Sequence, residues 1–276
     1  MNKEIVRAIC LEGDNVSCVG AVKNGEKIEL RYERYLPNNQ LLFSDPREGV
    51  CLVMPSQTRF TRTIRVPKES NSRKTDEAIR KQASDHIPFP LTDVKWDYKI
   101  TEDGEKDVRV RILAFTNENI SKEAEKLKRM RCRPSSVTSP EEALSNIIND
   151  GFVVYERGKN EAGLYVINKN NIYAADFSVK NEREITGLVL EGIIRYKSTQ
   201  LELKGGTRVE DIGPMYFLSG GDSEKRHHYQ LGAIFDSKEL EYNNFKGKKL
   251  EEYLALGAAL GEFSERSISI PIAETK

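Results

Sequence analysis

The sequence predicts a two-lobed α/β protein, and three observations lead to this prediction. The chain has 276 residues, of which 38% are hydrophobic, enough for one large domain or for two lobes with separate cores. Each half opens with a strand, a polar turn and a second strand, with one turn near Gly13 and the other near Asn168. Between them, residues 58–131 show the order strand-helix-strand-strand-helix, which is typical of a compact α+β unit.

The first half is expected to begin with a sheet. Apolar runs lie on both sides of a polar turn at residues 12–15, and the Asn24-Gly25 pair marks a second turn. Apolar and polar residues alternate over 59–66, which predicts a further, half-buried strand. The strands expected before it are 5–11, 16–22, 28–35 and 50–54.

A helix is expected after residue 67. Ile79, Ala83 and Ile87 recur at four-residue spacing, which puts them on one face of a helix, and Pro88 ends it. The rest of this unit is expected to consist of strands at 95–100 and 108–115 and a helix at 118–130.

The second half is expected to return to strands. A long helix should end at Gly205-Gly206, because glycine readily adopts the left-handed conformation that closes a helix. The helix at 250–260 is rich in Ala and Gly, and such small residues allow it to lie close to its neighbours. The other elements expected here are strands at 152–155, 164–167, 172–177 and 215–218 and a helix at 188–203.

Charge and composition narrow the class of protein. Basic and acidic residues balance at 43 each, so no overall field draws the protein to nucleic acid, and we expect no nucleic-acid partner. The sequence has no apolar run near the ~20 residues of a membrane helix and no signal-peptide pattern, so we expect a cytoplasmic protein. The cysteines form no C-x-x-C pair and are expected to be small buried residues in a reducing compartment. They are Cys10, Cys18, Cys51 and Cys132.

The sequence predicts neither a catalytic nor a metal site. His227 and His228 are adjacent, so on a regular element their side chains point apart and make a poor metal pair. The carboxylates are scattered, without the spacing of a paired general acid and base.

One segment is more specific. Residues 86–98 read His-Ile-Pro-Phe-Pro-Leu-Thr-Asp-Val-Lys-Trp-Asp-Tyr, and this stretch resembles the PilM family of type IV pilus assembly proteins. Family members show Ile-Pro-Phe-Pro-Leu, an acidic residue and then Val-x-x-Asp-Tyr after a helix. Residues 216–221 resemble the family's Leu-Ser-Gly-Gly turn, and 253–261 resemble its closing helix. The match covers most of the chain at low identity.

The resemblance implies a two-lobed actin-like (ASKHA) fold with an inserted α+β subdomain of the kind shared with the cell-division protein FtsA. The domains are then expected at 1–57 and 132–150 for the first lobe, 58–131 for the inserted subdomain and 151–276 for the second lobe. The long helix begins within about a dozen residues of Phe177, so the second lobe is expected to be pared down.

The resemblance also implies a function. PilM-like proteins are cytoplasmic scaffolds, peripheral at the inner membrane, that bind the N-terminal tail of PilN, a bitopic membrane protein, within a larger platform. The type II secretion protein GspL is a structural cousin, which leaves a secretion component as one alternative. An active actin-like ATPase or a filament-forming actin homologue is the other.

The partner surface has two candidate parts. Pro88 and Pro90 stiffen the chain around Phe89 and Leu91, which form either a docking surface or, with Trp96, part of the inserted unit's core. The family's groove between the first lobe and the inserted unit is expected to be walled by 58–66, 108–116 and 135–148. The stretch 267–272 is apolar and contains proline, so it is expected to be a final strand or, through self-association, to fill the groove of a neighbouring copy.

The nucleotide site of the family is expected to be degenerate here. In the first phosphate turn, Cys10 falls at the family's Asp and Glu12 at its Gly, although a one-residue shift brings Gly13 into register. The second phosphate turn falls on 166–170, where Asp and Gly are both missing. We therefore expect a pseudo-ATPase that binds no ATP or magnesium as cofactor. The residues expected to remain from the cofactor site are Gly13, Ser219, Gly220 and Gly221.

Overall fold

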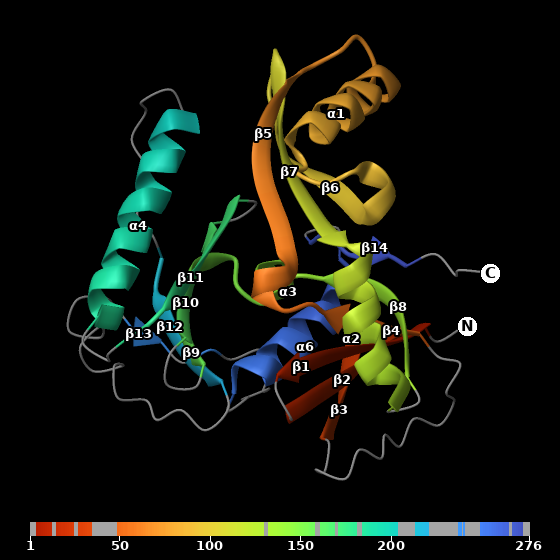
Figure 1. The fold of residues 1–276 in the computed structure, drawn as a ribbon, viewed down its shortest axis with the longest axis vertical. Helices are drawn as coiled ribbons and strands as arrows, with labels where there is room; N and C mark the ends of the chain where they lie inside the picture. Colours follow the sequence, from red (N-terminus) through yellow and green to blue (C-terminus); the bar gives the residue numbers. More distant parts are fainter. Residues whose placement is uncertain are drawn as a thin grey trace.

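Two mixed β-sheets with the same strand order make up the two lobes of the molecule (Figure 1). In the computed structural model, the residues whose structure is described are 4–12, 15–24, 27–34, 49–129, 132–157, 161–168, 171–180, 184–203, 213–220, 237–238, 240, 249–264 and 267–272.

The first sheet has the order β14-β8-β4-β1-β2-β3. Strands β1, β2 and β3 form an antiparallel meander, and β4 and β8 continue the sheet parallel to β1. A last short strand, β14, pairs antiparallel with β8 at the outer edge. The strands expected in this part of the chain are therefore confirmed. Their bounds are β1 Glu4–Glu12, β2 Asn15–Asn24, β3 Lys27–Arg34, β4 Gly49–Val53, β8 Arg133–Thr138 and β14 Ile270–Pro271.

The second sheet repeats this topology with the order β11-β10-β9-β12-β13. It also has a meander of three strands followed by two parallel ones. Strand β9 is thus the counterpart of β1, and β10 that of β2. The duplicated start expected from the sequence is confirmed. The bounds are β9 Asp150–Arg157, β10 Glu161–Asn168, β11 Asn171–Ser178, β12 Met215–Gly220 and β13 Ser237–Lys238.

One detail of the expected repeat was wrong. The turn near Asn168 joins β10 to β11, so its counterpart in the first half is the turn between β2 and β3. The counterpart of the turn near Gly13 is the one between β9 and β10. Sequence similarity between two short hairpins did not reveal which strand is central in the sheet.

The inserted unit lies between β4 and β8 and projects from the first lobe (Figure 1). Its sheet is antiparallel with the order β5-β7-β6. Helix α1 covers one face, where Ile79, Ala83 and Ile87 are buried as their spacing predicted. The Asn71 side chain caps the helix by accepting a hydrogen bond from the Lys74 N–H. The bounds are η1 Ser56–Thr58, β5 Arg59–Pro67, α1 Ser72–His86, η2 Leu91–Asp93, β6 Val94–Asp103, β7 Asp107–Thr116 and α2 Asn117–Arg129.

Two helices cover the outer faces of the lobes. Helix α2 follows the inserted strands in sequence but packs on the first sheet, where Ile120 and Leu127 share a cluster with Leu52 and Val137. Helix α4, Glu184–Leu203, begins shortly after β11 and covers the second sheet. Among the described helices, none is long and apolar enough to span a membrane.

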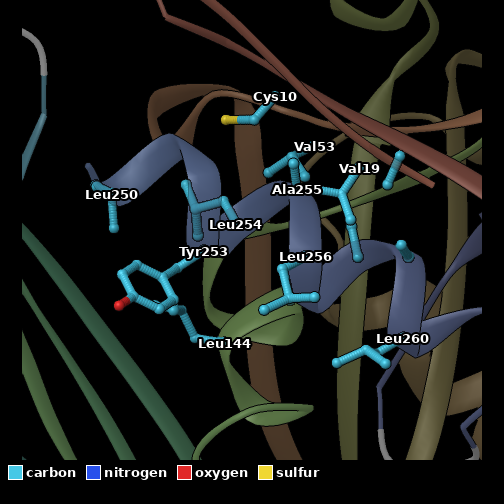
Figure 2. Close-up of a cluster of buried hydrophobic side chains, with 14 of the residues drawn as sticks. Cys10, Val19, Val53, Leu144, Leu250, Tyr253, Leu254, Ala255, Leu256 and Leu260 are labelled. Atoms are coloured by element: carbon cyan, nitrogen blue, oxygen red, sulfur yellow. The ribbon is translucent and has the colours of Figure 1, made fainter. Parts of the chain in front are cut away.

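The remaining two helices cross between the lobes. Helix α3, Pro140–Ser145, follows the first sheet yet contacts β10 and β11 of the second. Helix α6, Leu250–Gly261, follows the second sheet yet packs on β1, β2 and β4 of the first. One hydrophobic cluster therefore joins both lobes, and Figure 2 shows its side chains around α6. The four cysteines, as expected, are buried thiols.

The two crossing helices approach each other very closely. A Cβ atom at Gly257 of α6 would lie 2.1 Å from the carbonyl oxygen of Ala143 in α3. The Asn146 side chain donates a hydrogen bond to the Gly257 carbonyl oxygen at 3.0 Å and so links the helices at the same point. The glycine in this Ala- and Gly-rich helix is thus required by a backbone contact.

This contact leads to a stability prediction. Gly257→Ala should lower the free energy of unfolding by about 3 kcal/mol, because the added methyl group forces two backbones apart. The matched control is Gly187→Ala in α4, where an added Cβ meets nothing within 4 Å. That change should raise the free energy of unfolding by about 0.5–1 kcal/mol through helix propensity. Urea unfolding gives the free energy of unfolding of each variant. Equal changes in Gly257→Ala and Gly187→Ala would contradict the close contact between α3 and α6.

Candidate functional site

The residues expected to remain from a nucleotide site lie only partly within the described structure. Ser219 and Gly220 end β12 and pair with Glu156 and Arg157 of the central strand β9. They therefore lie at the carboxyl ends of parallel strands, where open α/β sheets bind ligands. Gly13 and Gly221 lie outside the described residues.

The position of Cys10 bears on the first phosphate turn. Its side chain is 3% exposed and belongs to the apolar cluster around α6, which also contains Val53 and Leu254 (Figure 2). A thiol in aliphatic surroundings provides no carboxylate to orient a metal-bound water.

The second phosphate turn was assigned to the wrong hairpin. Residues 166–168 end β10, and 169–170 connect it to β11, whereas the counterpart of the β1–β2 turn follows β9 at 158–160, outside the described residues. Near the end of β9, Tyr155 stacks on Tyr165 with ring centroids 4.9 Å apart, and its hydroxyl donates a hydrogen bond to Asp176. The inner face of β9 thus carries an aromatic side chain near its carboxyl end.

A polar cluster, buried except at Asp176, joins the two lobes near the end of β9. Arg59 Nε lies 2.7 Å from Glu141 Oε1, an ion pair without hydrogen-bond geometry, and Arg59 Nη1 donates to Asp176 Oδ2 at 3.1 Å. Burial raises the pKa of the Glu141 carboxyl, and the Arg59 charge opposes this rise. Burial tends to lower the pKa of Arg59, but the negative charges around it, Glu141 first, leave it raised. The interlobe cluster consists of Ser56, Arg59, Glu141, Tyr155, Tyr165 and Asp176.

A second buried ion pair fixes the inserted unit on the first lobe. Arg111 of β7 donates to both carboxylate oxygens of Glu142 in α3, from Nε at 2.6 Å and from Nη2 at 2.8 Å. The two side chains are 2% and 1% exposed, so the pair is desolvated as well as bidentate. Glu142 Oε2 also accepts the Ile268 N–H at 3.0 Å. One carboxylate therefore holds the inserted sheet and the segment after α6.

A cavity of about 450 Å³ lies beside this pair, between the inserted unit and the first lobe. We call it the groove. Its walls come from β6, from β8 and from the segment that follows α6. The lining residues are Asp97, Tyr98, Lys99, Ser135, Ser136, Gly261, Glu262, Ser264, Ser267, Ile268, Ser269 and Pro271.

Of the three stretches expected to wall a peptide groove, only one contributes to this cavity. Ser135 and Ser136 fall within the expected stretch 135–148, but 58–66 and 108–116 do not line the groove. The inserted unit contributes β6 instead, because β6 is the edge strand of its sheet on this side and β7 is central.

Glu262 closes the end of the groove near α6. Its Oε1 atom accepts hydrogen bonds from the hydroxyls of Ser136 in β8 and of Ser269 in the following segment. Burial, followed by the Glu262 charge, raises the pKa of the neighbouring Cys51 thiol. This thiol therefore stays protonated at neutral pH.

Phe89 and Leu91 do not fill the core of the inserted unit. Each is 42% exposed, so the core interpretation of Phe89 was wrong. The apolar stripe of α1 ends at Ile87, which is 5% exposed, and the chain then turns outward. Trp96 does pack against the α1 cluster, with the Arg80 guanidinium 5.8 Å from its ring centroid. Neither Phe89 nor Leu91 lines the groove, so their partner role stays a prediction.

Sequence reasoning missed the buried ion pairs, although the strand pattern carried a signal for them. Arg109 and Arg111 interrupt the apolar run of β7 at alternating positions, which puts both on the face opposite α1. Charged residues at such positions are buried only when paired. The residues that pair with Arg111 and Arg59 follow β8 in an acidic Glu141-Glu142 step.

Comparison with known proteins places the fold. No protein-family model matches the chain. No curated protein matches it either. A chain of the PilM–PilN type IV pilus biogenesis complex is similar in structure, with a TM-score of 0.53 and 14% identity over 92% of this chain and 96% of that one. The cytoplasmic domain of EpsL, an inner-membrane component of the type II secretion system of Vibrio cholerae, aligns with a TM-score of 0.47 and 11% identity over 92% and 94%. The first likeness and the repeated sheet topology confirm the expected two-lobed, actin-like fold.

The Arg111–Glu142 pair leads to a prediction. Glu142→Gln keeps the shape of the side chain but leaves the Arg111 charge buried without its counter-ion, and should lower the free energy of unfolding by about 3–5 kcal/mol. Glu77→Gln is the matched control, since its partner Arg73 is 88% exposed. The control should change stability by less than about 0.5 kcal/mol. Urea unfolding gives the free energy of unfolding of both variants. A loss in Glu142→Gln as small as that in the control would refute the role given to this pair.

Proposed function

We propose that the chain is a cytoplasmic scaffold of a type IV pilus-like or secretion assembly platform, peripheral at the inner membrane, that binds the N-terminal tail of a PilN-like bitopic protein. The groove is the observation that carries this proposal. It lies beside β8, where the first sheet is completed at its edge only by the two-residue strand β14. An extended peptide gains affinity from such an edge through backbone hydrogen bonds and a few buried side chains.

The choice of partner follows from the similar structure. That structure is a complex of PilM with PilN that acts in type IV pilus biogenesis. The groove of this chain suits a short, extended segment, since five of its twelve lining residues are serines that can bond a peptide backbone. Other proteins of the platform would contact the remaining surface, where Phe89 and Leu91 are exposed.

Rigidity is what such a scaffold requires. The Arg111–Glu142 pair holds the inserted unit against α3, and the interlobe cluster holds the second lobe against the first. The Arg111–Glu142 pair is buried and joins the inserted unit to the first lobe, so it keeps the groove walls at a constant separation. The proposed activity needs no chemistry, only a preformed site that leaves the partner's membrane helix free.

We further propose that the chain is a pseudo-ATPase. Cys10 occupies an apolar cluster at the position of the family's acidic residue. Tyr155 stacks on Tyr165 and bonds Asp176 on the inner face of the second lobe. Isothermal titration of ~100 μM protein with ATP and magnesium should therefore detect no binding, and no phosphate release should exceed that of buffer. A stoichiometric isotherm or steady turnover would identify an active ATPase instead.

The partner claim is tested with a peptide. A labelled N-terminal peptide of the bitopic protein encoded beside this chain should bind with a Kd on the order of 1–100 μM. Ser135 is exposed and lines the groove, so Ser135→Trp should fill it and weaken binding at least ~10-fold. Ser70→Trp, at an exposed serine of the inserted unit outside the groove, should bind like the parent. Absence of binding at ~100 μM, or equal binding by both variants, would sink the proposal.

A further inference from the structure

The groove already holds part of the chain itself. The edge segment, residues 267–272, runs along β8 with Ile270 opposite Val137 and Pro271 opposite Ser136. Ile268 and Ile270 are 3% and 2% exposed and belong to the first lobe's hydrophobic cluster. The edge segment thus inserts alternate apolar side chains into the lobe, as a peptide ligand added to a sheet would.

Side chains as well as backbone groups hold the edge segment beside its pairing with β8. The Ile268 N–H donates to Glu142 Oε2 at 3.0 Å, and its carbonyl oxygen accepts from Thr138 Oγ1 at 2.8 Å. The Ile272 N–H donates to the Ser135 carbonyl oxygen at 2.8 Å. Pro271 has no N–H to add to the ladder. The regular pairing of the edge segment with β8 is limited to the two residues of β14.

The groove is also wider than the edge segment. Ser267, Ser269 and Pro271 form one side of the 450 Å³ cavity, and β6 forms the other. A bound strand with larger side chains on that side would fill space that the edge segment leaves open.

We propose that the edge segment is an internal ligand of the groove and that a partner peptide binds by replacing it. The fitting peptide is extended, with apolar residues at two alternating positions followed by proline, like Ile268, Ile270 and Pro271. That the replacing strand comes from a membrane protein's tail rests on the proposed function. Strand replacement itself depends only on contacts within this chain.

The geometry favours a separate partner over a second copy of this chain. Five residues, 262–266, connect the end of α6 at Gly261 to the edge segment and can span at most about 18 Å. Glu262, the first of them, is itself bonded to Ser136 and Ser269. An exchanged segment would therefore need two first lobes almost in contact, whereas a free peptide has no such limit.

An internal ligand competes with an added one, and this gives the test. Since a partly closed site binds in proportion to its open fraction, releasing the edge segment should strengthen peptide binding and locking it should abolish binding. Ile270→Asp releases it by placing a charge in the apolar cluster. Ser269→Cys locks it, because the Ser269 oxygen lies 3.9 Å from Cys51 Sγ, and diamide can join the two thiols. The probe is a fluorescein-labelled synthetic peptide of residues 264–276.

The expected order of affinity is Ile270→Asp, then the parent, then oxidised Ser269→Cys, with at least ~10-fold between the first and the last. Dithiothreitol should restore the locked protein to the parent's affinity. Ser269→Cys combined with Cys51→Ser is the control and should not respond to diamide. Equal affinity in the released and locked proteins, or a dimer on size-exclusion chromatography of the parent, would overturn the proposal. Because the probe is the chain's own sequence, this outcome is independent of whether a membrane-protein tail binds.

Hydrogen exchange of the parent provides a second measurement should Ile270→Asp not fold. The amides of Ile268 and Ile272 should exchange at least ~10-fold faster than the core amides of β4, through local opening. With the probe peptide added, the amides of Ser135–Thr138 should exchange no faster than in the parent alone, because the peptide takes the place of the edge segment beside β8. If Ile268 and Ile272 exchange only as fast as β4, the edge segment does not open and the proposal fails.

Discussion

Gly257 of α6 lies directly against the carbonyl oxygen of Ala143 in α3, and this close approach sets the distance between the two lobes. Each crossing helix ends one half of the chain and packs on the sheet of the other half, so neither lobe has a complete core by itself. The cluster in Figure 2 is therefore shared, with β1, β2 and β4 on one side of α6 and residues of the second sheet on the other. Small residues on α6 permit this arrangement, because any side chain at Gly257 would separate the helices.

The position of α3 then determines the polar contacts. Glu141 and Glu142 are adjacent on this short helix and point to different partners, Arg59 and Arg111. Burial of these charges is costly, as the raised pKa of Glu141 indicates, and hydrophobic replacements are often as stable. Charge pairs do, however, accept only one geometry. We infer that they orient the inserted unit relative to the lobes, which apolar contacts alone would allow to slide.

The groove lies where the Arg111–Glu142 pair fixes the inserted unit on the first lobe. A peptide site needs a sheet edge with fixed walls. The first sheet ends here with the short strand β14 beside β8, and β6 of the inserted unit forms the opposite wall. The proposed scaffold role thus uses the surface that the fold keeps rigid, and the edge segment occupies that surface within the chain itself.

The sequence by itself determined the local elements and, through the stretch 86–98, the fold class. The stripe Ile79, Ala83 and Ile87 and the alternation along 59–66 depend only on near neighbours in the chain, so their elements were predicted correctly. Only the tertiary structure decided which hairpins are equivalent, which strand lines the groove, that Phe89 is exposed and that 267–272 pairs with β8. These features depend on contacts between residues far apart in sequence, and periodicity carries no information about which distant strand or helix lies alongside.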